Sequence, residues 1–466
     1  MPHDADTYGP GSCKHPEVVN VGVANLPYYQ PVTEPTPGTA LPAKDWPQNE
    51  NLPLLLQPIK IGKTAQMEVR NRIFVSPMCM YSAAAEGDDV GALTPFHLVH
   101  LGAFALRGAG VVMVEATSVL PNGRLSPQDS GLWNDNQRDK LRPIFDFIKA
   151  QGARAAIQIG HGGRKTSTLA PWLDTSTIKE PLKSHVATNG AASGWTDNVM
   201  APSAIPYDAE TYPHPREMTD KDFEELSQAF VDAARRADEA GADILEIHSA
   251  HGYLLHNFLS PLSNQRTDKY GGSLENRLRY PLELISAVRK VWPTSKPLFL
   301  RLSASDCYPD GEKDEKTGEY ISWGVEQSQV YVKEAIARGV DLIDVSSAGN
   351  TPKQQIKVGP GYQVPFSDQI RQSLTPEERE KVLISAVGLI TDGKQAEQIL
   401  QEGKSDVISV AREFIRHADL VFDWAHELGS VVNVPVQWQR AHTRMMTKPE
   451  EKEKKQQEKA DKEQKN

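Results

Sequence analysis

Two histidines and a tyrosine follow directly after an apolar run, and they are the residues of this chain best suited to chemistry. In ADILEIHSAHGY (242–253) the run ends at His248, and His251 and Tyr253 come next. Two imidazoles can hold an oxygen atom that gains negative charge, and a phenol can deliver a proton nearby. The HxxH spacing is only weakly specific, so half of a metal site or a hydrogen-bonded histidine pair at a strand end stays open.

Composition narrows the classes of function. The chain has 466 residues and a net charge of -10, which speaks against a nucleic-acid partner. Cys13, Cys79 and Cys307 form no disulfide framework and no CxxC pair, so we expect a reducing, cytoplasmic setting. There is no apolar stretch long enough to span a membrane and no secretion signal at the N-terminus. We therefore expect a cytoplasmic enzyme without a membrane or nucleic-acid partner.

Eight short apolar runs along the chain predict the strands that position His248, His251 and Tyr253. Continuous apolar runs are typical of strands buried on both faces of a parallel sheet. The runs occupy 72–78, 110–119, 153–160, 242–249, 297–304, 340–349, 381–390 and 405–412.

Helical patterns lie between the runs. The periodicity predicts helices over 220–241, 323–339 and 392–403, the last with Thr391 as its N-cap. Eight strand–helix units predict an α/β fold of the (β/α)8, or TIM, barrel type. An open doubly wound sheet would need a glycine fingerprint after its first strand, and SPMCMYSA lacks one.

The remaining segments define the domain organisation. Residues 1–52 are rich in proline and polar residues and predict an irregular, partly disordered extension. The barrel is expected over 53–446, with a long loop region (166–217) after the third strand. Residues 447–466 carry mixed charge without an apolar stripe, which predicts a disordered tail.

Active sites of such barrels lie at the carboxyl ends of the strands. Arg301 stands inside the apolar strand PLFLRLSA, which is costly unless it meets an anion; a salt bridge to Glu246 or Asp344 is the alternative. The last two strands, ending near Gly388 and Arg412, predict a phosphate cradle. We therefore expect a phosphate-bearing cofactor.

Five sequence blocks stand out, namely SPMCMYS, QIGHGGRK, HSAHGYLLHNFLSPLSNQRTDKYGGSLENR, AVGLITDG and PVQWQRA. Together they resemble the Old Yellow Enzyme family of FMN-dependent ene-reductases, and the resemblance covers about residues 52–446. Cys79 and the PVQWQRA ending are similar to the subclass with a cysteine beside the flavin and an arginine, here Arg440, that reaches the neighbouring subunit's site. The resemblance thus implies a homo-oligomer, a dimer or larger.

The resemblance also implies a reaction and roles. NADPH, or NADH in its place, would reduce FMN, and the small-molecule substrate would be an α,β-unsaturated carbonyl compound. His248 and His251 would hold the carbonyl oxygen, Tyr253 would donate the proton, and Tyr81 and Arg440 would contact the substrate. The residues implied for FMN are Ser76, Pro77, Met78, Cys79, Ala116, Gln158, Arg301, Gly388, Ala411 and Arg412, with no metal.

Several alternatives stay open. Cys79 could only pack, Tyr81 could only cover the core, Arg440 could lie on the surface, and Lys165 could be solvated rather than contact phosphate or substrate. Ala411 stands where the family usually has glycine. Two other functions are a metal-dependent aldolase or isomerase that uses His248 and His251, and a non-catalytic flavin-binding scaffold.

Overall fold

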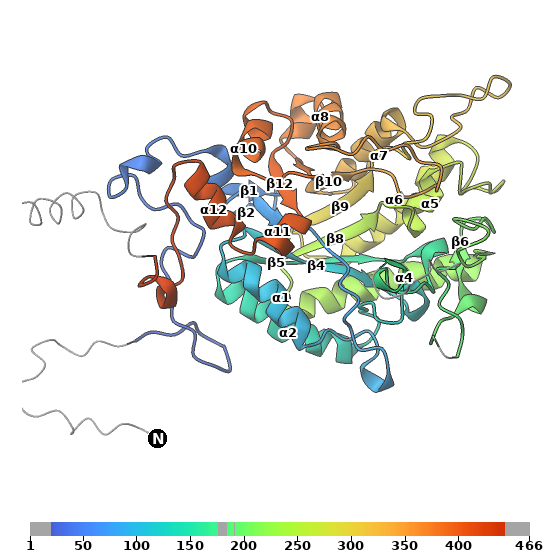
Figure 1. Ribbon diagram of the computed structural model, residues 1–466. Helices are drawn as coiled ribbons and strands as arrows, with labels where there is room; N and C mark the ends of the chain where they lie inside the picture. Colours follow the sequence, from blue (N-terminus) through green and yellow to red (C-terminus); the bar gives the residue numbers. More distant parts are fainter. Residues whose placement is uncertain (1–19, 176–183, 191, 443–466) are drawn as a thin grey trace, which may run out of the picture.

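The protein is a closed barrel of eight parallel strands with helices around it (Figure 1). The computed structural model describes residues 20–175, 184–190 and 192–442. Each barrel strand lies within one of the eight predicted runs, so the predicted fold is confirmed. The strands, in barrel order, are β3 (Ile73–Val75), β4 (Val111–Ser118), β5 (Arg154–Gly160), β8 (Ile244–Ser249), β9 (Leu298–Ser303), β10 (Leu342–Ser346), β11 (Leu383–Ala386) and β12 (Val407–Val410), which closes on β3.

The three helices predicted from periodicity are present. They are α4 (Asp220–Ala240), α7 (Val325–Ala337) and α10 (Gly393–Gln401). Gly241 ends α4 in the left-handed region, at φ 98°. The predicted cap of α10 is wrong by one residue: Asp392, not Thr391, is the N-cap, because its carboxylate accepts from Gln395 N at 2.8 Å.

The other helices and strands complete the architecture. The longer helices are α1 (Pro95–Leu106), α2 (Asp135–Ala150), α6 (Leu274–Val291), α8 (Val364–Ser373) and α12 (Leu420–Glu427). The shorter ones are α3 (Trp172–Thr175), α5 (Leu254–Leu259), α9 (Pro376–Arg379) and α11 (Arg412–Arg416). Two small sheets pair β1 (Ile59–Ile61) with β2 (Met67–Val69), and β6 (Met200–Ala201) with β7 (Arg216–Glu217).

The barrel interior changes from apolar to polar along the strands. Its amino-terminal end is filled by apolar side chains such as Phe74, Ile244 and Phe299, against which Ile61 of β1 and Val69 of β2 pack. Further along the same strands, the interior holds buried Glu246, Arg301 and Asp344, among others. The carboxyl ends of the strands are therefore the end of the barrel at which polar chemistry can take place.

The segment 20–52 runs without long helices or strands and packs against the chain that follows α12. Ala40 forms an isolated bridge with Val432, and Asn49 Nδ2 donates to the carbonyls of Leu41 and Val431, both at 2.7 Å. The predicted tail at 447–466 lies outside the described residues. Within the described ranges, no helix has the length and apolarity needed to cross a bilayer.

Candidate active site

The structure brings together the three residues at the end of β8. His248 is the fifth residue of the strand, and a tight turn carries His251 and Tyr253 back towards it. The ring centroids of His248 and His251 are 5.2 Å apart, those of His248 and Tyr253 are 4.9 Å apart, and those of His251 and Tyr253 are 6.3 Å apart. We call residues 250–253 the histidine turn.

The histidine turn has an unusual backbone. His251 adopts φ 59° and Gly252 φ 71°, both in the left-handed region. A Cβ on Gly252 would lie 2.1 Å from the carbonyl oxygen of Gly349, so only glycine fits there. Tyr253 N donates to Ala250 O at 3.1 Å and closes the turn.

Hydrogen bonds fix where the imidazole protons lie. Ala250 N is 3.2 Å from His248 Nδ1 and can only donate, so the proton of His248 is on Nε2. That nitrogen is 3.4 Å from His251 Nδ1, and His251 Nε2 is 2.6 Å from Ser346 Oγ. Ser346 Oγ in turn donates to Gln363 Oε1 at 3.1 Å. The hydrogen bonds therefore run in one direction, from His248 through His251 and Ser346 to Gln363, and each histidine donates through Nε2.

Burial keeps all three groups uncharged. Burial, and then the positive charge of Arg301, lowers the pKa of His248 and of His251 well below the ordinary value. Burial raises the pKa of Tyr253 well above its ordinary value. At neutral pH the end of β8 therefore holds an intact phenol and two neutral imidazoles, whose Nε2–H groups face His251 Nδ1 and Ser346 Oγ.

A buried charge cluster lies deeper in the barrel, on neighbouring strands. Arg301 Nε is 3.1 Å from Asp344 Oδ2, so the salt bridge left open by the sequence is formed. Gln158 Nε2 donates to Glu246 Oε1 at 2.7 Å. Within the described residues, the second carboxylate oxygens of Glu246 and Asp344 have no hydrogen-bond partner. Burial, and then the charge of Asp344, raises the pKa of Glu246 to about 8.

A cavity of about 170 Å³ opens over the ends of β9 to β12. Gly388 adopts φ 119°, and a Cβ there would lie 2.9 Å from Gln363 Nε2. The sequence-predicted residues Arg301, Gly388, Ala411 and Arg412 all line this cavity, together with His251 and Ser346. A cation-lined hollow of this kind suits a phosphate-bearing group.

The end of β3 contributes a second wall. Ser76 is buried, and within the described residues its Oγ has no hydrogen-bond partner. Pro77, Met78 and Cys79 follow it half-buried. Burial, and then the charges of Asp129 and Glu115, raises the pKa of Cys79 well above its ordinary value, so the sulfur is a thiol.

Two further predicted residues lie near this wall. Tyr81 has φ 51°, and its ring meets the edge of Trp172 at 5.5 Å between centroids. Ala116 lies where the pairing of β4 with β5 shifts register, and it shares a cavity of about 20 Å³ with His248 and Tyr253. The ends of β3 and β4 therefore approach the histidine turn.

The Lys165 side chain is half-buried and hydrogen-bonded rather than solvated. It lies in a 3-10 turn after β5, and its Nζ donates to the carbonyls of His251, at 3.0 Å, and Gly349. The same nitrogen is 4.1 Å from the centroid of the Tyr207 ring. Burial lowers the pKa of Lys165 to about 7. A solvated charge is therefore the wrong interpretation, and a contact with phosphate or substrate stays a prediction.

Arg440 lies apart from these groups within one subunit. It is exposed, follows the 3-10 helix Val436–Trp438, and does not line either cavity described above. In the described part of the chain, no group of three or more His, Cys, Asp or Glu side chains is arranged to hold a metal ion.

Known proteins that are similar to this chain identify its family. Residues 54–430 match the model of the "NADH:flavin oxidoreductase / NADH oxidase family". The chain is 42% identical over 419 residues to the NADH:flavin oxidoreductase FG08077 of Gibberella zeae, covering 89% of this chain and 94% of the relative. It is also 42% identical to an NADPH dehydrogenase of Geobacillus sp. (strain WCH70), covering 80% and 94%.

The fold is also that of a solved relative. The old yellow enzyme from Trypanosoma cruzi superposes with a TM-score of 0.61 at 22% identity, covering 82% of this chain and 94% of that one. The resemblance of the sequence blocks to the family is thereby confirmed, and with it the use of FMN and of a nicotinamide, whereas membership of the subclass with a cysteine beside the flavin stays a prediction. The chain belongs to the NADH:flavin oxidoreductase / NADH oxidase family, whose barrel it shares with the old yellow enzymes, and is an FMN-dependent NAD(P)H oxidoreductase.

Proposed function

We propose that this oxidoreductase is an ene-reductase that uses NADPH to reduce the C=C bond of α,β-unsaturated carbonyl compounds. The observation that carries the proposal is the convergence of two neutral imidazole N–H donors and one protonated phenol at the end of β8. A carbonyl oxygen that gains negative charge needs such donors, and the neighbouring carbon needs a proton.

The predicted cofactor residues fit FMN in three respects. The cavity over β9 to β12 has cations and a glycine without space for a side chain, which suits the phosphate. Arg301 places a buried cation beneath the histidine turn, where the pyrimidine edge of a flavin would gain negative charge. Ser76 Oγ and Glu246 Oε2 have no hydrogen-bond partner among the described residues and could contact the cofactor. The residues proposed to hold FMN are Ser76, Pro77, Met78, Cys79, Ala116, Gln158, Arg301, Gly388, Ala411 and Arg412.

FMN, when bound, would supply the hydride, which it takes from NADPH, to the β-carbon of the substrate. His248 and His251 exchange their Nε2–H contacts with His251 Nδ1 and Ser346 Oγ for hydrogen bonds to the carbonyl oxygen of the bound substrate, whose negative charge grows during hydride transfer. Because both imidazoles are neutral, each donates without giving up its proton. Loss of one such donor typically slows a reaction about 100- to 1000-fold.

Tyr253 gives its phenolic proton to the α-carbon. Its raised pKa keeps that proton in place at neutral pH, so the acid is available at the moment of transfer. Tyr81 would border the substrate, and the Cys79 thiol would lie against the bound flavin. Arg440 reaches the site of a second subunit, so the active form is a dimer or larger.

The test is a spectrum of the purified protein followed by anaerobic titration with NADPH and then with 2-cyclohexenone. The proposal expects a yellow protein that bleaches with NADPH and regains its colour with the enone, releasing cyclohexanone. An FMN-loaded protein that stayed yellow with both NADPH and NADH would contradict the proposal. So would a protein that bleached but was not reoxidised by enones. Elemental analysis of the same sample separates the metal-dependent alternative.

A further inference from the structure

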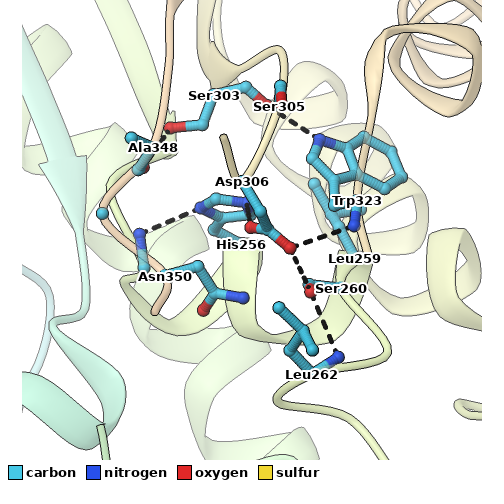
Figure 2. Close-up of polar contacts among 12 residues, drawn as sticks. His256, Leu259, Ser260, Leu262, Ser303, Ser305, Asp306, Trp323, Ala348 and Asn350 are labelled. Carbon is cyan, nitrogen blue, oxygen red and sulfur yellow. Dashed lines mark hydrogen bonds and ion pairs between the residues drawn. The ribbon is translucent and has the colours of Figure 1, made fainter. Parts of the chain in front are cut away.

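Behind the histidine turn lies a buried acid–imidazole pair that the proposed reaction does not use. His256 of α5 and Asp306, which follows β9, are both fully buried, and His256 Nε2 lies 3.1 Å from Asp306 Oδ1 (Figure 2). Burying an ionisable pair is costly, so a pair of this kind calls for a reason.

The other ring nitrogen of His256 contacts the turn itself. Gly252 N donates to His256 Nδ1 at 2.9 Å. Since a backbone N–H can only donate, Nδ1 must carry the lone pair, and the ring proton is on Nε2, facing Asp306. The carboxylate and the turn therefore select the same tautomer of His256 from opposite sides.

Asp306 is held in place as a carboxylate. Its Oδ2 accepts from Ser260 Oγ at 2.6 Å and from Trp323 N at 3.0 Å (Figure 2). Burial would raise the pKa of Asp306, but hydrogen bonds from His256 and Ser260 outweigh it and keep the pKa below the ordinary value. The acceptor facing His256 is thus ionised and immobile.

Trp323, which contacts Asp306, is also linked to the histidine turn by hydrogen bonds through Ser303. Trp323 Nε1 donates to the carbonyl of Ser303 at 2.8 Å, as Figure 2 shows, and Ser303 Oγ accepts from His251 N at 2.9 Å. Asn257 Nδ2 donates to Gly252 O at 2.9 Å. The backbone groups of the turn are therefore held mainly by side chains rather than by a ladder of backbone bonds.

The left-handed backbone of the histidine turn needs hydrogen bonds of this kind to hold it in place. A non-glycine residue in the left-handed region, as His251 is, costs about 1–3 kcal/mol and persists only where its surroundings fix it. We propose that His256 and Asp306 are positioning residues, which hold Gly252 N–H so that the peptide between His251 and Tyr253 keeps both side chains aimed at the substrate. This inference rests on the proposed ene-reduction.

Asp306→Asn tests the tautomer directly. The amide oxygen must take the place of Oδ2, where two donors meet, so the amide NH₂ faces His256 Nε2. The ring proton then moves to Nδ1 and opposes Gly252 N–H. A misplacement of about 1 Å can cost 100-fold, so we expect reoxidation of the reduced enzyme by 2-cyclohexenone to slow about 10- to 100-fold.

Two internal comparisons separate positioning from general damage. Reoxidation of the same reduced holoenzyme by dioxygen does not use the turn and should change less than about twofold, below the effect of a 1 Å misplacement. In a Tyr253→Phe background, the factor by which Asp306→Asn slows the enone reaction should be at least about five times smaller than in the wild type, because the effects of coupled residues are not additive. Equal slowing with both oxidants, or additive effects, would overturn the proposal.

His256 variants give an independent test. His256→Asn keeps an acceptor near the position of Nδ1, whereas His256→Leu removes it. We expect the asparagine variant to retain at least about ten times the enone rate of the leucine variant, the effect of about 1.4 kcal/mol. Equal rates for the two would overturn the proposal. So would the loss of FMN from both Asp306→Asn and His256→Asn, because the pair would then hold the barrel rather than the turn.

The outcomes also separate this inference from the function beneath it. If Tyr253→Phe alone leaves the enone rate unchanged, the assignment of Tyr253 as the acid fails. If Tyr253→Phe slows the enone reaction and Asp306→Asn does not, only the positioning role fails.

Discussion

Replacement of Arg301 by methionine should destabilise the folded protein and weaken FMN binding together. Arg301 is 7% exposed, and its Nε lies 3.1 Å from Asp344 Oδ2. At an effective dielectric constant of about 20, two unit charges at that distance attract by about 5 kcal/mol. Methionine keeps most of the volume but leaves Asp344 and Glu246 buried without a cation.

The expected loss is set by the unpaired carboxylates. Breaking a buried pair by removing one partner typically costs about 3–5 kcal/mol, and we expect that loss in the free energy of unfolding of the apo-protein at pH 8. Burial already raises the pKa of Asp344 and, with the charge of Asp344, the pKa of Glu246 to about 8. Arg301 lowers both pKa values, so its removal raises them further.

The direction of the pH dependence follows from these shifts. A carboxyl group whose pKa is higher in the folded state favours folding at low pH, and that contribution is lost as the pH rises through the folded pKa. In Arg301→Met the two carboxyl groups can take up protons at pH 5.5, so the loss of stability should be smaller there than at pH 8.

The assay is urea unfolding of apo-protein at both pH values, with FMN titration by fluorescence quenching at pH 8. Arg338→Met is the matched control, because Arg338 pairs with Glu334 at a partly exposed site and such pairs contribute at most about 1 kcal/mol. A loss below about 1 kcal/mol for Arg301→Met at pH 8 would refute the reasoning, since it would fall within the range of exposed pairs. So would a loss that grows towards pH 5.5.

Three other predictions concern separate parts of the site. Gly388→Val should raise the Kd for FMN at least about tenfold (about 1.4 kcal/mol), because Gly388 has a positive φ and a side chain there would collide with Gln363. The control Gly359→Val should leave the Kd unchanged, because its Cβ would meet open space, and equal Kd values for the two variants would contradict the prediction. Lys165 has a pKa of about 7, below its unfolded value, so the wild type should gain stability from pH 7 to 10 by urea unfolding, and Lys165→Met should lack that gain; equal slopes would contradict it. Light scattering of the wild type should give at least twice the chain mass of 51.5 kDa, with the KM for enone raised in Arg440→Ala; a wild-type monomer would contradict the proposed reach of Arg440.

Local patterns were enough to predict the barrel. All eight strands form within the predicted runs, because a strand buried on both faces needs a continuous apolar stretch whatever its neighbours are. The cap of α10 was placed one residue early because Thr391 and Asp392 are both good capping residues, and only the geometry shows which side chain reaches Gln395 N.

Contacts between distant segments could not be predicted in the same way. The sequence placed Arg301 in an apolar strand but left its partner open, and Asp344 becomes that partner only when β9 pairs with β10. Burial of Lys165 depends on carbonyls about 86 and 184 positions away. His256 and Asp306 are 50 residues apart, and neither stands in a spacing that signals a pair; only the short separation of His256 from Tyr253 could have drawn attention to it.

The central claim is that Tyr253 and the two neutral histidines carry out the reduction of an enone. The most direct measurement is the rate of anaerobic reoxidation of the reduced enzyme by 2-cyclohexenone in the wild type, Tyr253→Phe and Tyr331→Phe. Tyr331 is a buried tyrosine of α7, hydrogen-bonded to Ser249, and serves as the control. We predict full reoxidation by the wild type with one cyclohexanone per flavin, a rate at least about 100-fold lower for Tyr253→Phe, and a control rate close to the wild type. A wild-type enzyme that the enone does not reoxidise, or a Tyr253→Phe rate equal to that of the wild type, would contradict the claim.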